Sequence, residues 1–159
     1  MKILVCTDGS EHCDKALEEA SELAVNLKSA VSVTVIHIYK RKYTDSAWSV
    51  SNEEAQETKS PAEVEEMREH LRALDEQELL ERKKVLEKAA EVFKQKNLEV
   101  QTRLKEGHPA KSICEVASGE GFDLVVVGSR GRGGLWDVFL GSVSNAVVQN
   151  CATNVLVVK

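Results

Sequence analysis

Short and almost wholly apolar runs recur along the chain, and longer amphipathic stretches separate them. A run that is apolar at consecutive positions is typical of a parallel strand covered on both faces. Such runs, with one alternating segment, predict five strands, at residues 3–6, 31–39, 98–104, 122–127 and 154–159. Apolar residues at three- and four-residue spacing predict helices at residues 11–28, 110–119 and 142–151. The alternation of strand and helix favours an α/β fold, with a parallel sheet and helices on both of its faces.

The middle of the chain departs from this alternation. Residues 40–60 are polar without a clean period and are expected to form a loop. Ser60-Pro61-Ala62-Glu63 then has the features of a helix start, with a serine cap, an early proline and the glutamate of a capping box. As one helix, the charged stretch that ends at Lys96 would be roughly 50 Å long, which exceeds a domain of this size. We therefore expect either a break near residues 75–78 or a projecting first half. The charges of this half form either a solvated face or a coiled-coil or partner-binding surface.

Composition and charge narrow the class of partner. The 159 residues suit a single domain, and a net charge of −5 argues against a nucleic-acid partner. No apolar segment approaches the length of a membrane-spanning helix, and the first residues lead into a strand and not into a secretory signal. We therefore expect a cytoplasmic protein without a membrane partner. The four cysteines form no CxxC pair, and we expect them to be reduced and mostly buried: Cys6, Cys13, Cys114 and Cys151.

The segment from Gly128 to Ser144 carries the strongest functional signal. It follows an apolar strand and leads into a helix start, and it is rich in glycine. Glycines let backbone N–H groups approach an anion closely, and a helix N-terminus adds unpaired N–H groups and partial positive charge. The hydroxyls of Ser142 and Ser144 add donors, and Arg130 and Arg132 could add charge. The pattern predicts a phosphate-binding loop, although a glycine-rich surface turn with helix caps would have a similar sequence.

The glycine spacing distinguishes this loop from better-known ones. The lysine of a P-loop is missing, and so is the third glycine of a dinucleotide fingerprint. Two residues separate Gly128 from Gly131, and nine separate Gly131 from Gly141-Ser142. This G-2x-G-9x-G-[ST] pattern resembles the universal stress protein family in its ATP-binding branch. The resemblance implies a Rossmann-like sheet of order 3-2-1-4-5, a single domain over residues 1–159 and an insertion at about residues 40–87. It also implies a homodimer through the last strand, Val155 to Val158.

The implied strand order places the ligand. In an open parallel sheet, ligands bind at the carboxyl ends of the strands where the order reverses, here between the first and fourth strands. The resemblance implies that Ile38 contacts adenine and that Cys6 borders it, with ATP and Mg²⁺ as the ligands. Asp8 either accepts ribose hydroxyls or helps to organise Mg²⁺, or it only caps the turn into the first helix. The expected contact residues are Cys6, Thr7, Asp8, Ile38, Val127, Gly128, Ser129, Arg130, Gly131, Gly141, Ser142, Val143 and Ser144.

The sequence favours a nucleotide-dependent switch in the stress response over a committed enzyme. No GxSxG or HExxH motif is present, and His37 lies inside an apolar strand, where a structural role is commoner than a catalytic one. Slow ATP hydrolysis, or autophosphorylation on Ser142 or Ser144, is the alternative use of the same site. An enzyme that cleaves ATP between its α and β phosphates would need an SGGxDS-type loop, where Thr7-Asp8-Gly9-Ser10 stands. A pure interaction module would not need the glycine spacing.

Overall fold

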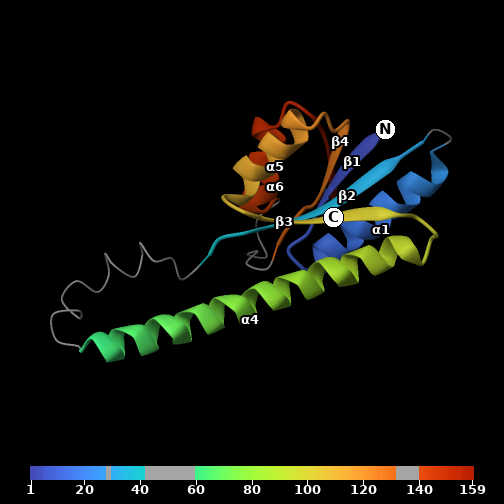
Figure 1. Ribbon diagram of the computed structural model, residues 1–159. Coiled ribbons are helices and arrows are strands. Elements are labelled where there is room, and N and C mark those ends of the chain that lie inside the picture. Colours follow the sequence, from blue (N-terminus) through green and yellow to red (C-terminus); the bar gives the residue numbers. More distant parts are fainter. Residues whose placement is uncertain (28–29, 42–59, 132–139) are drawn as a thin grey trace.

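Five parallel strands form one sheet at the centre of the molecule (Figure 1). The computed structural model describes residues 1–27, 30–41, 60–131 and 140–159. The strands are β1 (Lys2–Cys6), β2 (Ser32–Tyr39), β3 (Val100–Glu106), β4 (Leu124–Gly128) and β5 (Asn154–Val158). Their order is β3-β2-β1-β4-β5, which confirms the predicted fold. Because β1 pairs with β2 on one side and with β4 on the other, the order reverses at β1 and β4.

Alternate residues of the central strand face two separate cores. Ile3 and Val5 pack under α1 (Glu11–Asn26) and α4 (Pro61–Lys94), in a core that includes Leu17 and Phe93. Leu4 and Cys6 face the opposite side, where α5 (Pro109–Gly119) and α6 (Ser142–Asn150) cover the sheet. Figure 1 shows the two helix pairs on opposite faces. Successive side chains of a strand point to opposite faces. Because helices cover both faces of β1, its consecutive residues are all apolar.

Helix α4 is continuous and projects beyond the sheet. Its 34 residues extend about 51 Å at 1.5 Å per residue. Its buried residues, Leu86, Ala89 and Phe93, all lie in its second half, while the first half extends away from the sheet (Figure 1). Of the two expected alternatives, a projecting helix is correct and a break near residues 75–78 is wrong. The predicted capping box is present, because Ser60 accepts from the Glu63 N–H and Glu63 accepts from the Ser60 N–H.

The expectation of four reduced cysteines is wrong for two of them. Cys114 of α5 and Cys151 at the end of α6 form a disulfide, with Cα atoms 4.9 Å apart. Helices α5 and α6 pack side by side on one face of the sheet, and this brings residues distant in sequence into bonding range. Cys6 and Cys13 are free and buried, as expected. Among the described helices, none combines the length and apolar character needed to cross a membrane.

Candidate functional site

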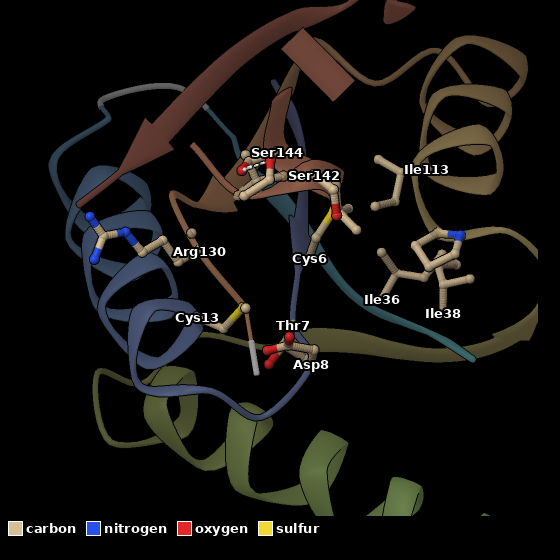
Figure 2. A pocket seen from close by; sticks show the side chains of 16 residues that line it. Cys6, Thr7, Asp8, Cys13, Ile36, Ile38, Ile113, Arg130, Ser142 and Ser144 are labelled. Carbon is tan, nitrogen blue, oxygen red and sulfur yellow. Dashed lines mark hydrogen bonds between the residues drawn. The ribbon is translucent and has the colours of Figure 1, made fainter. Parts of the chain in front are cut away.

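A cavity of about 360 Å³ opens where the strand order reverses. Figure 2 shows side chains from both faces of the sheet converging on it. Its lining includes every residue that the sequence predicts for the site except Ser129. The lining residues are Cys6, Thr7, Asp8, Cys13, Ile36, Ile38, Pro109, Ile113, Val127, Gly128, Arg130, Gly131, Gly141, Ser142, Val143 and Ser144. The predicted residues therefore gather around one cavity, although Arg132 lies outside the described residues.

Asp8 connects the loop after β1 to the loop after β4. Its Oδ1 accepts a hydrogen bond of 2.9 Å from the Ser10 N–H, so it does stabilise the turn into α1. A Cβ added to Gly131 would lie only 2.5 Å from Oδ2 of Asp8, so this oxygen faces the second loop. Thr7 supports the same turn, since its hydroxyl accepts from the Gly9 N–H at 3.1 Å. One carboxylate thus shapes the first loop while its other oxygen lies against the second loop, beside the cavity.

The two glycines at the start of the second loop allow close approaches. A Cβ on Gly128 would lie 2.6 Å from the His12 carbonyl oxygen, so only glycine lets the end of β4 reach the first turn of α1. At Gly131 the close neighbour is instead the end of the Asp8 side chain, which can turn aside. Packing between the loops therefore requires glycine at position 128, whereas a side chain at 131 would displace the Asp8 carboxylate. Arg130, which follows Gly128 closely, lines the cavity, but its guanidinium points away from the apolar side chains in Figure 2.

The end of the second loop presents the N-terminus of α6 to the cavity. Gly141 is the N-cap residue, and its N–H donates to the Ser129 carbonyl at 2.7 Å. The first intrahelical hydrogen bond runs from the Asn145 N–H to the Gly141 carbonyl. The N–H groups of the preceding three residues, Ser142 to Ser144, therefore have no partner within the helix. An anion placed there would meet backbone donors and the positive end of the helix dipole.

The two serines of the predicted hydroxyl pair have different roles. Ser142 is exposed at the first position of α6. Ser144 is buried, and its hydroxyl donates to the Ser129 carbonyl at 2.8 Å and approaches the Gly141 carbonyl at 3.0 Å. Its one hydroxyl proton thus closes the loop in this structure, and its expected contact with phosphate or a metal stays a prediction. Ser129 is likewise a loop-closing residue, since its carbonyl accepts from both Gly141 and Ser144.

The other end of the cavity is apolar, and here the sequence analysis missed several residues. Ile36, Pro109 and Ile113 join the predicted Ile38 and Val127 in the lining, and Cys13 of α1 also lines the cavity, away from the isoleucines (Figure 2). Ile36 could have been found, because residues two apart on a strand share a face. Pro109 and Ile113 lie in the first two turns of α5, which begins just after the carboxyl end of β3. Only the strand order brings this helix to the site, so a local pattern could not reveal it.

Neither cavity thiol is suited to redox or metal chemistry. Burial raises the pKa of the Cys6 thiol far above its usual value, and the neighbouring Cys13 adds to the effect. Burial also raises the pKa of Cys13. A thiolate is the reactive species, so both groups behave as small apolar side chains. Among residues 1–27, 30–41, 60–131 and 140–159, no cluster of three or more His, Cys, Asp or Glu side chains could hold a metal ion.

His37 is buried beside the site but does not line the cavity. Its Nδ1 lies 2.7 Å from the Thr7 carbonyl oxygen, and its Nε2 lies 3.3 Å from Nη1 of Arg82. Both ring nitrogens are therefore engaged by groups of the protein, which agrees with the structural role expected from the sequence.

Comparison with known proteins gives matches along the full chain. Residues 1–159 match the profile of the Universal stress protein family. The chain is 34% identical to universal stress protein YxiE of Bacillus subtilis over 161 residues, covering 99% of this chain and 98% of YxiE. Its fold is similar to that of UspA from Lactobacillus plantarum, with a TM-score of 0.76, 21% identity, and coverage of 100% of this chain and 97% of UspA.

Two further structures with this fold contain an adenine nucleotide. The universal stress protein from Archaeoglobus fulgidus, in complex with dAMP, has a TM-score of 0.67 and 18% identity, covering 100% of this chain and 98% of that protein. The Arabidopsis thaliana family protein with AMP bound has a TM-score of 0.59 and 21% identity, covering 100% and 91%. These likenesses show the fold. The whole-chain match to the family profile and the identity to YxiE show that this chain belongs to the universal stress protein family.

Proposed function

We propose that the chain binds an adenine nucleotide, namely ATP together with Mg²⁺. In this proposal the chain acts as a nucleotide-dependent switch in the stress response. The observation that carries this proposal is the division of one cavity into an apolar end and an end that carries backbone donors. A volume of about 360 Å³ lies within the usual range for small-molecule sites, about 300–1,000 Å³. The dAMP and AMP complexes of proteins with the same fold support an adenine nucleotide as the ligand.

The division of the cavity sets the orientation of the ligand. The base lies against Ile38 and Ile113, where burying its faces is favourable. The ribose hydroxyls donate to Asp8, since an ionised carboxylate only accepts. The phosphates lie at the N-terminus of α6, where Ser142 contributes a hydroxyl donor and the unpaired N–H groups contribute the rest.

The described residues fit Mg²⁺ only as a companion of phosphate. Asp8 is the one carboxylate among the described residues that line the cavity. Mg²⁺ usually keeps several waters and combines one or two carboxylates with substrate phosphates. Holding the ion is the alternative role of Asp8, in which the carboxylate and the Ser142 hydroxyl would bind Mg²⁺ in place of accepting from the ribose. The ion would neutralise phosphate charge near a protein whose net charge is −5.

A switch requires that the nucleotide bind two states with different affinity. We propose that one of these states is a homodimer formed through β5. This strand lies at the edge of the sheet, and Leu156 is 37% exposed. An apolar edge strand is a template for pairing with another chain. Sedimentation velocity with and without ATP measures the coupling, and a monomer in both conditions would refute the dimer.

For the alternative reaction, autophosphorylation, we propose Ser142 as the acceptor in preference to Ser144. Its exposed hydroxyl stands beside the proposed phosphate position, whereas the Ser144 proton is engaged with backbone carbonyls. Mass spectrometry after incubation with ATP and Mg²⁺ tests this alternative. Phosphate on a Ser142→Ala variant, or none on the unmodified chain, would refute it.

Calorimetric titration of nucleotide-stripped protein tests the binding proposal. The added Cβ of a Gly131→Ala variant would displace the Asp8 carboxylate. Losing a hydrogen bond to a charged group costs about 1.5–3 kcal/mol, so we expect roughly 10- to 150-fold weaker binding of ATP with Mg²⁺. Gly119→Ala is the matched control, because its Cβ would meet nothing within 4 Å. If the unmodified protein binds none of ATP, ADP and AMP, the proposal is wrong.

A further inference from the structure

Helix α4 reaches the loop that carries Asp8 by two routes, one direct and one through His37. A Cβ added to Gly9, the next residue, would lie 3.2 and 3.3 Å from the two methyl carbons of Val85. One turn earlier on α4, Arg82 contacts His37, which in turn contacts the Thr7 carbonyl. The residues on both sides of Asp8 are therefore held by side chains that depend on α4. Figure 2 shows this helix passing beneath Thr7 and Asp8, on the side opposite Ile113.

The hydrogen-bonding capacities of these groups fix the state of His37. The Thr7 carbonyl can only accept, so Nδ1 of His37 carries the proton. The Arg82 guanidinium can only donate, so Nε2 presents its lone pair at 3.3 Å. Both contacts are satisfied together by the neutral Nδ1–H tautomer. Arg82 thus selects the form of the ring that donates to Thr7.

Arg82 is itself held in place on other sides. Its Nη2 donates to Glu78 at 2.8 Å, one turn back on α4. Its guanidinium carbon lies 5.0 Å from the centre of the Tyr39 ring at the end of β2, a cation–π distance. The side chain is only 18% exposed. The guanidinium has a carboxylate, an aromatic face and an imidazole as neighbours, so it has little freedom to move by itself. A displacement of α4 would therefore displace the guanidinium too.

The contact at Thr7 bears on the orientation of Asp8. The Thr7 carbonyl and the Asp8 N–H belong to one planar peptide unit. Fixing the direction of this carbonyl therefore fixes the plane that precedes the Asp8 Cα atom. The peptide unit that follows the Asp8 Cα atom ends at Gly9, which has a φ of +77° and lies against Val85. The carboxylate is thereby aimed from a backbone that α4 restrains on both sides.

We propose that Arg82 is a positioning residue of the nucleotide site, which it affects through His37 and the Thr7 carbonyl without contacting the ligand. The proposal rests on the nucleotide binding proposed above. It gives the projecting helix a function, because α4 extends from Arg82 back to Pro61 without a break. Coupling between two sites is reciprocal, so anything that displaces the projecting half changes nucleotide affinity, and nucleotide binding restrains the helix.

The first test compares three substitutions on the same helix by calorimetric titration with AMP and with ATP and Mg²⁺. Side chains that couple sites without touching the ligand change affinity by about two- to thirtyfold, and we expect Arg82→Met to fall in this range. Arg82→Lys retains the charge and a single donor nitrogen, so it should recover part of the loss. Arg72→Met is the matched control, since Arg72 is 64% exposed and pairs only loosely with Glu65, at 3.9 Å. It should bind as the unmodified protein does.

The second test reads the contact directly, without a ligand. The ¹⁵N chemical shifts of the His37 ring report which nitrogen carries the proton and whether the other accepts a hydrogen bond. Arg82→Met should shift the Nε2 signal, and Arg72→Met should leave it unchanged. Hydrogen exchange of α4 amides at residues 82–88 should slow when AMP is added to the unmodified protein, and less so in Arg82→Met.

The outcomes separate this proposal from the one on which it rests. If the unmodified protein binds no adenine nucleotide, the proposed function fails, and unchanged His37 shifts in Arg82→Met would then also overturn the positioning contact. If the protein binds nucleotide and Arg82→Met binds it within twofold of the same affinity, only the positioning role is overturned. The same holds if Arg72→Met and Arg82→Met weaken binding equally, since the effect would then belong to the helix as a whole.

Discussion

Loss of the disulfide between Cys114 and Cys151 should destabilise the protein strongly. The bridge closes a loop with a sequence separation of 37 residues. The chain-entropy relation for a loop of this length gives about 4 kcal/mol at 25 °C, mainly by restricting the unfolded chain. Domains of this size have net stabilities of about 5–15 kcal/mol, so the bridge is a substantial part of the total. At about 2–4 °C per kcal/mol, the melting temperature should fall by about 8–15 °C.

Thermal unfolding followed by circular dichroism, with and without reductant, measures this effect. Cys114→Ala and Cys151→Ala should each lower the melting temperature, and the double variant should fall little further because one bridge is lost in every case. Reductant should not affect the variants. Thiol titration of the denatured protein provides the control. It should count Cys6 and Cys13 before reduction and all four cysteines after it.

Four thiols in the denatured protein before any reduction would show that the bridge does not form, and the stability argument would then fail at its first step. If the thiol count confirms that the bridge has been reduced and the melting temperature does not change, the stabilisation of about 4 kcal/mol is refuted. The bridge also has a consequence for the site. It joins α5, which carries Ile113, to α6, which begins at Ser142, so reduction should also weaken the proposed nucleotide binding.

Two substitutions test the packing that supports the site. Phe93→Ala removes a fully buried ring between α4 and the sheet. The free energy of unfolding in urea should fall by about 3–5 kcal/mol. A loss below about 1 kcal/mol would contradict this packing. Gly128→Ala places a Cβ 2.6 Å from the His12 carbonyl oxygen, so we expect a loss of about 1–3 kcal/mol in the same assay, whereas the control Gly119→Ala should be neutral or stabilising.

The sequence predicted the elements well because their apolar patterns are local. It could not decide whether α4 breaks, since the apolar spacing slips between Leu74 and Leu79. The structure resolves this in favour of one helix, and the composition explains why. No glycine or proline occurs between Pro61 and Gly107. The other residue types cost a helix little, so the helix continues even where its apolar stripe is interrupted. Only the second half needs a stripe, because only that half covers the sheet.

The features that the sequence missed all depend on distant segments meeting. Cys114 and Cys151 have no local signal for pairing, and their contact follows from two helices sharing one face of the sheet. Pro109 and Ile113 reach the cavity only because of the strand order, which periodicity does not give and the family resemblance did. The different roles of Ser142 and Ser144 follow from the position of each residue at the start of α6, which places one hydroxyl outside and the other against the loop.

The closed ends of the second loop constrain how a nucleotide could act as a signal. The N–H of Gly141 and the hydroxyl of Ser144 both donate to the Ser129 carbonyl, and the Ser129 N–H donates to the Val158 carbonyl of β5. The donors at the start of α6 are thus held in place by the protein's own hydrogen bonds, before any ligand is present. A ligand that meets the same donors in every state shifts no equilibrium, however tightly it binds. If the proposed switch operates, differential affinity has to arise at contacts between the site and other elements, and the two that the structure offers are Arg82 of α4, through His37, and the edge strand β5, through Ser129.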